Sequence, residues 1–165
     1  MSNLVLELRQ GETMIVNGAP IRFRTKSRIE LTAKARFLFG KQIMAPEQAD
    51  TPARRIYFAL QAAYIGAEHE RPAGLELARE LVKAFKDATT SALACDILDR
   101  AIAAAETDDC YLALKLARRI IRHEEAVMSN LASDLAGDQP GACDHPPLTG
   151  TQHRHADQHA CSARV

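Results

Sequence analysis

The sequence predicts an α+β fold. A small antiparallel β lobe, residues 1–50, is expected to precede a helical lobe of about four helices, residues 51–135, with the two packed as one unit. Two observations lead to this expectation: apolar residues recur at every second position in the first forty residues, and at helical spacing after Thr51-Pro52. A third observation, the loss of periodicity in a segment rich in Gly, Pro and His, predicts a disordered tail over 136–165.

Alternation of apolar and polar residues predicts the strands of the β lobe. The first run places leucine at every second position from Leu4 to Leu8. The dipeptide Asn17-Gly18 is a strong hairpin signal, because both residues tolerate positive φ. One face of the resulting sheet or partial barrel should pack and the other should be cationic. The residues expected to point inward in the later runs are Ile29, Leu31, Phe37 and Phe39.

The first helix is predicted to begin at Thr51-Pro52. Threonine is a favourable N-cap, because its side-chain oxygen accepts a hydrogen bond from a free amide, and proline is tolerated in the first turn. The helix should run to Gly66, and between Ile56 and Gly66 its surface is apolar except for Gln61. A helix that is apolar on nearly all sides is normally buried.

Three further helices are predicted within residues 72–88, 91–106 and 108–135, and they should pack against the first helix and the inner face of the sheet. The apolar stripes expected to face the core are Leu75, Ala78, Leu81, Val82 and Phe85 in the second helix, Leu93, Ile97, Leu98, Ala101 and Ile102 in the third, and Ala113, Leu116, Ala117, Ile120, Val127 and Leu131 in the fourth.

Several classes of function are disfavoured. The sequence contains no HExxH, GxSxG, GxGxxG or GxxxxGK[ST] motif, so we expect neither an enzyme nor a cofactor or small-molecule substrate. The N-terminus lacks the pattern of a signal peptide, and no apolar run approaches the ~20 residues that span a bilayer, so we expect a cytoplasmic protein with no membrane partner. The cysteines form no CxxC pair and are expected to remain thiols.

The tail concentrates residues of the kinds that bind metals. Their spacing matches no closed tetrahedral site, so a solvated polar tail is preferred over a metal site. These residues are Cys143, His145, His153, His155, His159 and Cys161.

The distribution of charge points to an anionic partner, although the net charge is zero. Seven cations and one acid lie between Arg22 and Lys41, and phenylalanines interleave with them. Cations beside rings suit single-stranded RNA, but the pattern taken alone favours the alternative that the rings face the core while the cations are merely solvated. Arg54 and Arg55 lie in the first helical turn, where the helix dipole disfavours cations, so an acid or a ligand phosphate should pair with them. The candidate RNA-binding residues are Arg22, Arg24, Lys26, Arg28, Lys34, Arg36, Arg54 and Arg55. A second basic stripe, Lys115, Arg118 and Arg122, is diluted by Glu124 and Glu125.

Several motifs follow one another along the chain: "QGETMIVNGAPI" is followed by "KQIM", "DTPAR" and "IYFALQAAY", and later by "YLALKLARRIIRHEE". This succession resembles the flagellum biosynthesis repressor protein FlbT family, and the resemblance extends to about Leu135. It implies a post-transcriptional regulator that binds the 5′ untranslated leader of flagellin mRNA and lowers its translation or lifetime, beside a small helical companion, FlaF. Some members act positively, and the resemblance supplies no site residues.

The function expected from the sequence is therefore mRNA binding without cleavage. A rival hypothesis is a protein-interaction module, in which the helical lobe binds FlaF or flagellin and the effect on mRNA is indirect. The rival requires exposed apolar surface on the helices, whereas RNA binding requires contiguous cations on the strands.

Overall fold

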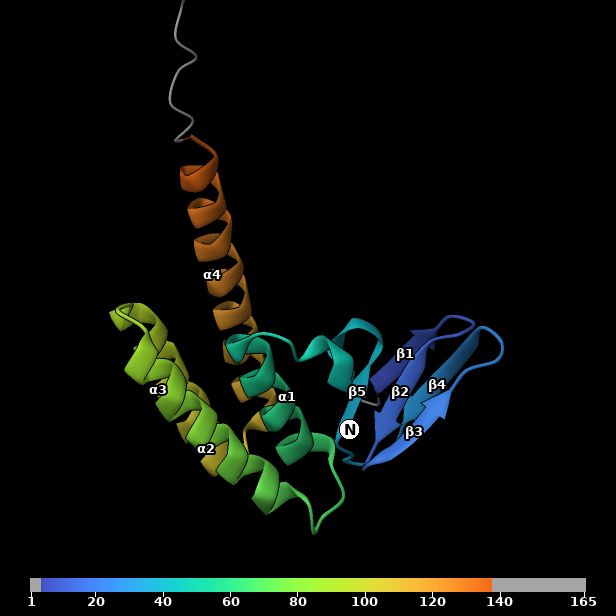
Figure 1. Cartoon of the computed structure of the whole chain (residues 1–165). Coiled ribbons are helices and arrows are strands. Elements are labelled where there is room, and N and C mark those ends of the chain that lie inside the picture. Colours follow the sequence, from blue (N-terminus) through green and yellow to red (C-terminus); the bar gives the residue numbers. More distant parts are fainter. Residues whose placement is uncertain (1–3, 138–165) are drawn as a thin grey trace, which may run out of the picture.

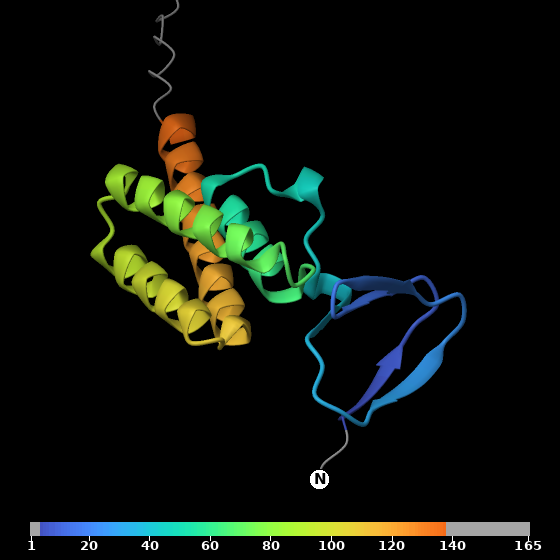
Figure 2. The same ribbon diagram turned by 90° about the horizontal axis from the view of Figure 1, so that it is seen from below.

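The computed structural model describes residues 4–137, and it has the predicted α+β architecture. Five short strands form a β lobe at one side of four helices, as Figure 1 shows. The view turned by 90° in Figure 2 shows the same side-by-side arrangement. The predicted disordered tail lies outside the described residues from residue 138 onward. None of the helices in the described part is long and apolar enough to cross a bilayer.

The strands form two antiparallel sheets rather than one. β1 (Leu4–Leu8) pairs with β4 (Ser27–Leu31), while β2 (Thr13–Val16) lies between β3 (Ala19–Arg22) and β5 (Phe37–Phe39). The predicted hairpin is confirmed: β2 and β3 are joined by Asn17 (φ 49°) and Gly18 (φ 87°). Positive φ at both central residues is the geometry that matches the twist of the flanking strands.

The two faces of β5 pack against different neighbours. Leu38, which is 1% exposed, and its β2 partner Ile15 face the helical core, so this face of the sheet meets the helices (Figure 1). Phe37 and Phe39, which we expected to point inward, lie on the opposite face with the fully buried Met14 and are partly buried. Their rings stack at 6.3 Å.

The helices begin at the residues that their capping signals predict. α1 (Pro52–Ile65) is capped by Thr51, whose side chain accepts from the Arg54 amide, and α3 (Ala92–Glu106) by Ser91. The other two helices are α2 (Arg71–Ala88) and α4 (Cys110–Gly137). Two short 3-10 helices, Gly40–Gln42 and Pro46–Gln48, lie in the linker between β5 and α1.

α1 is the centre of the core, as its apolar surface predicted. Ile56, Tyr57 and Leu60 are buried, and α2 approaches the helix closely at Gly74. A Cβ at Gly74 would lie 2.8 Å from the backbone nitrogen of Ala63, so no larger residue fits without movement of one helix.

Three residues of the predicted apolar stripes are exposed instead of buried. Leu93 of α3 is 61% exposed, and Val127 and Leu131 of α4 are also exposed. Val127 lines an open groove between α2 and α4, and Leu131 lies farther along α4, so helical periodicity continues on α4 where neighbouring elements leave its side chains largely uncovered.

Buried hydrogen bonds attach the linker to α1. The Met44 amide donates to Gln61 Oε1 (2.8 Å), and Gln61 Nε2 donates to the Met44 carbonyl (2.9 Å). The Tyr57 hydroxyl donates to the Gln42 carbonyl at 2.6 Å. Gln61 therefore satisfies both backbone groups of one linker residue, and the linker has a fixed position beside α1.

Candidate nucleic-acid interface

The cations of the β lobe do not form the single row that their alternation predicted. Arg22 ends β3, Arg24 and Lys26 lie in the connection 23–26, and Arg28 lies on β4. The chain leaves one sheet after Arg22 and enters the other at Ser27, so the four side chains do not share one strand face. The expectation that these cations occupy one face of a single sheet is therefore wrong.

Acidic residues also lie on the face that Arg28 occupies. Glu7 is directly opposite Arg28 in the pairing of β1 with β4, and Glu30 follows two residues later on the same face. In contrast, Arg22, Arg24, Lys26 and Lys34 are exposed, and none of them takes part in an ion pair within residues 4–137. We call these four residues the strand-lobe cations.

Arg36 connects the β lobe with the turn between α3 and α4. Its Nη2 lies 2.5 Å from Asp108 Oδ1, and its guanidinium lies 5.9 Å from the centroid of the Tyr64 ring. Arg36, one of the eight residues that the sequence assigned to RNA binding, is therefore paired with an acid of the protein itself.

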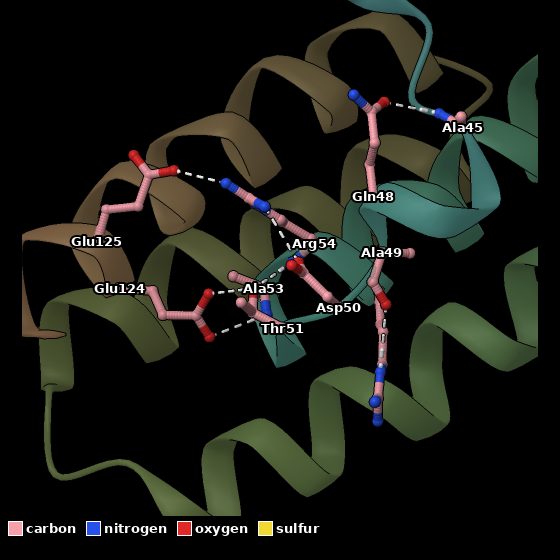
Figure 3. Close-up of polar contacts among 10 residues, drawn as sticks. Ala45, Gln48, Ala49, Asp50, Thr51, Ala53, Arg54, Glu124 and Glu125 are labelled. Atoms are coloured by element: carbon pink, nitrogen blue, oxygen red, sulfur yellow. Dashed lines mark hydrogen bonds and ion pairs between the residues drawn. The ribbon is translucent and has the colours of Figure 1, made fainter.

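Arg54 is paired with acids from two segments. Figure 3 shows its guanidinium between Asp50 (3.0 Å) and Glu125 (3.2 Å). The hydrogen bond with Glu125, followed by that with Asp50, raises the pKa of Arg54 above its usual value. The expected acid partner for this first-turn cation is thus present. The neighbouring Arg55 donates from Nε to the Ala49 carbonyl at 3.4 Å.

Glu124 connects α4 to the start of α1 (Figure 3). One carboxylate oxygen accepts from the Ala53 amide (3.2 Å), and the other accepts from the Thr51 hydroxyl. A carboxylate at the N-terminus of a helix satisfies free amides and interacts favourably with the helix dipole. Glu124 and Glu125, the two acids beside the basic stripe of α4, therefore bind residues at the start of α1.

A second cationic surface lies between α4 and the linker. Two neighbouring hollows, of about 530 and 30 Å³, share Tyr57 and Arg118 in their lining, and we call the surface that they make up together the basic furrow. Ile43, Met44 and Ile121 line the wider hollow. The cations that line the furrow are Lys41, Arg54, Lys115, Arg118 and Arg122.

Arg118 is held at the centre of the furrow. Its Nη2 donates to the Lys41 carbonyl at 2.5 Å, and the guanidinium lies 5.3 Å from the centroid of the Tyr57 ring. Burial raises the pKa of Tyr57, and the nearby charge of Arg118 opposes this shift. Because the pKa is raised, the tyrosine is neutral, and its ring makes a cation–π contact with Arg118.

Sequence reasoning found only one side of this furrow. The spacing of Lys115, Arg118 and Arg122 placed them on one face of a helix. Nothing local in the sequence brings Lys41 to the same surface, because its position depends on the hydrogen bonds between the linker and α1.

The described residues provide no metal site. Within residues 4–137, no three His, Cys, Asp or Glu side chains gather in a way that could hold a metal ion. The Cys and His residues of 143–161 lie outside the described residues.

These features define a small α+β protein with exposed cationic surfaces suited to an anionic partner. The sequence model of the family described as flagellar protein FlbT matches residues 4–128, and the chain belongs to this family. The resemblance inferred from the sequence motifs is therefore confirmed.

Individual relatives agree with this assignment. The chain is 31% identical over 149 residues to a "probable flagellum biosynthesis repressor protein FlbT" of Mesorhizobium japonicum, which covers 86% of this chain and 92% of the relative. A protein of the same name from Chelativorans sp. is 31% identical over 75% of this chain and 85% of its own length. The Brucella ovis relative is 38% identical over 50% of this chain and 57% of its own length. No solved structure matches the chain.

Proposed function

We propose that this protein is a cytoplasmic repressor of flagellin synthesis that binds the 5′ untranslated leader of flagellin mRNA without cleaving it. Membership of the FlbT family, whose relatives are named as probable repressors of flagellum biosynthesis, supports the repressor role. RNA is proposed as the target because the strand-lobe cations form no ion pair with an acid within residues 4–137. Such cations attract and hold phosphates.

The proposed mechanism is that the bound protein covers part of the leader. A protein bound to the leader competes with the ribosome for the same RNA, or alters the access of nucleases to it, and neither effect requires a catalytic group. FlaF is a proposed companion, and it would act by changing the affinity of this protein for the leader.

Charge reversal at two strand-lobe cations is expected to weaken leader binding. The variant Arg22→Glu/Arg24→Glu should bind about tenfold more weakly or worse, because two phosphate contacts become repulsive. In the wild type, log K should fall with log salt by ~0.7 for each phosphate neutralised, and the slope for the variant should be shallower by about 1.4. A filter-binding titration of the purified protein against the flagellin leader, with and without FlaF, measures both quantities.

The matched control is Lys83→Glu/Arg100→Glu. Both residues are exposed cations on other helices, and this pair changes the net charge by the same amount. If the two double variants bind the leader equally, the strand-lobe cations are only solvated surface. If the wild type does not bind the leader at all, direct repression through the leader is wrong.

The protein-interaction function is a second candidate, and one observation favours it. A groove of about 380 Å³ between α2 and α4 is lined by Leu81, Phe85, Val127 and Met128 among others. Met128 is 57% exposed, so apolar surface is available on the helices. This function predicts that FlaF or flagellin binds the purified protein without RNA and that Met128→Glu abolishes the complex.

A further inference from the structure

The basic furrow differs from the other hollows in the charge of its lining. Within residues 4–137, no Asp or Glu lines either part of the furrow. Three other hollows of the described region contain carboxylates: one contains Glu124, one Asp108, and one Asp87, Asp99 and Glu106. The linings of those three hollows contain acidic residues, whereas every charged residue that lines the furrow is a cation.

Four of the five furrow cations are available for such a ligand. Arg54 is neutralised by Asp50 and Glu125. The remaining four, Lys41, Lys115, Arg118 and Arg122, take part in no ion pair within residues 4–137. They come from both sides of the depression, so an anion in the furrow would be approached from the linker and from α4 together.

The geometry of the furrow is fixed before a ligand arrives. Gln61 and Tyr57 fix the linker side through their bonds to Met44 and Gln42. Arg118 uses one donor for the Lys41 carbonyl and keeps further N–H donors of its planar guanidinium for phosphate oxygens. The linker and Arg118 are therefore ordered before binding, which lowers the entropy that binding costs at these two places.

The furrow also contains surfaces on which bases can lie. Tyr111 at one end is 43% exposed, and Lys115 Nζ lies 4.8 Å from its ring centroid. Ile43, Met44 and Ile121 form an apolar part of the wider hollow. Base stacking on an aromatic ring beside a cation is the usual way in which single strands bind, whereas a duplex keeps its bases away from such surfaces.

The length of the cationic stripe suits a short stretch of nucleic acid. Lys115 and Arg122 are seven residues apart on α4, which is about 10.5 Å along the helix axis. Arg118 lies between them on the same face. Two or three nucleotides of an extended strand can follow this stripe.

From the cations that lack an acid partner, the fixed linker and the exposed ring, we infer that the basic furrow binds two or three unpaired nucleotides of single-stranded RNA. This inference rests on the proposed function, in which the RNA is the flagellin leader. The strand-lobe cations then hold additional phosphates, and the furrow distinguishes unpaired from paired segments of the leader.

The test compares two charge-reversal variants of the full chain. Lys115→Glu/Arg122→Glu should lower the affinity for the leader by about tenfold or more, and it should lower the affinity for a short single-stranded oligonucleotide from the leader similarly. The control Lys83→Glu/Arg100→Glu, which makes the same change in net charge outside the furrow, should bind both RNAs as the wild type does. Circular dichroism melting establishes that both variants are folded.

A second pair of variants tests stacking. Tyr111→Ala should weaken binding of the oligonucleotide about tenfold, while Tyr111→Phe should keep it, because phenylalanine retains the ring. Ultraviolet crosslinking of the oligonucleotide to the wild-type protein, which is independent of variant folding, should place a crosslink in the peptide that contains Tyr111.

The outcomes separate the two proposals. If the wild type binds the leader and the furrow variant binds it equally well, the furrow inference is wrong and the proposed function stands. Stronger binding of a duplex than of the single strand by the wild type would also overturn the inference. Polyglutamate serves as a probe for an acidic protein segment. If the furrow variant loses polyglutamate binding while its RNA binding is unchanged, the inference is overturned and the furrow is assigned to an acidic protein segment. If the wild type binds single-stranded RNA through the furrow without preference for the leader, the proposed function fails and the inference stands. Absence of any RNA binding by the wild type overturns both.

Discussion

Leu60→Ala is expected to lower the free energy of unfolding by about 2–5 kcal/mol. Leu60 is 1% exposed and belongs to the core cluster in which α1 meets the other helices. Removing its side-chain carbons loses transfer free energy and leaves a cavity that closely packed neighbours cannot fill completely. Denaturation by urea, followed by circular dichroism, measures the change.

The same substitution on the surface provides the control. Leu77 lies on α2 and is exposed, so Leu77→Ala should change the free energy of unfolding by less than about 0.5 kcal/mol. Leucine and alanine both favour helices, which removes helix propensity as an explanation of any difference. Equal stability of the two variants would show that α1 is not the centre of the core.

Local signals explain which parts of the fold could be predicted from the sequence. Thr51-Pro52 and Asn17-Gly18 act through hydrogen bonds and φ preferences of neighbouring residues, so their consequences do not depend on the rest of the chain. The start of α1 and the first hairpin were accordingly predicted correctly.

Long-range pairing explains the errors in the β lobe. The connection 23–26 contains Thr25 between Arg24 and Lys26 and lacks the Gly, Asn or Asp that usually marks a turn. Alternation across this connection therefore resembled one strand, although β4 pairs with β1 and β3 pairs with β2. Strand partners distant in sequence are chosen by packing, and a period of two does not identify them.

In the candidate site, too, local features could be predicted from the sequence and long-range ones could not. The stripe of Lys115, Arg118 and Arg122 follows from helical spacing, whereas the position of Lys41 depends on the linker. The pairing of Arg54 with an acid was anticipated as an alternative to a ligand phosphate, because a first-turn cation is unfavourable by itself.

Gln61→Ala is expected to lower the free energy of unfolding by about 2–4 kcal/mol. Gln61 is 6% exposed, and in the sequence it seemed only to interrupt an apolar helix. Its loss would leave the amide and the carbonyl of Met44 without partners, and each unsatisfied buried group costs about 1–3 kcal/mol unless water enters. Gln48→Ala is the matched control, because Gln48 accepts from the Ala45 amide at an exposed position. Equal losses of stability in urea denaturation would contradict a special role for Gln61.

Gln61→Glu should make the stability of the protein depend on pH in a defined direction. The introduced carboxyl group can donate to the Met44 carbonyl only when it is protonated, and burial also favours the neutral form. Its pKa in the folded state should therefore lie above the value of about 4.3 in the unfolded chain. The stability of the variant relative to the wild type should be greatest below about pH 4.3 and should fall by about 1.4 kcal/mol per pH unit until the pH reaches the folded-state pKa. Urea denaturation of both proteins between pH 4 and pH 7 measures this difference, with Gln48→Glu as the exposed control. A difference that stays constant over this range would mean that the carboxyl group remains solvated and that the bond from residue 61 to the linker does not require a donor.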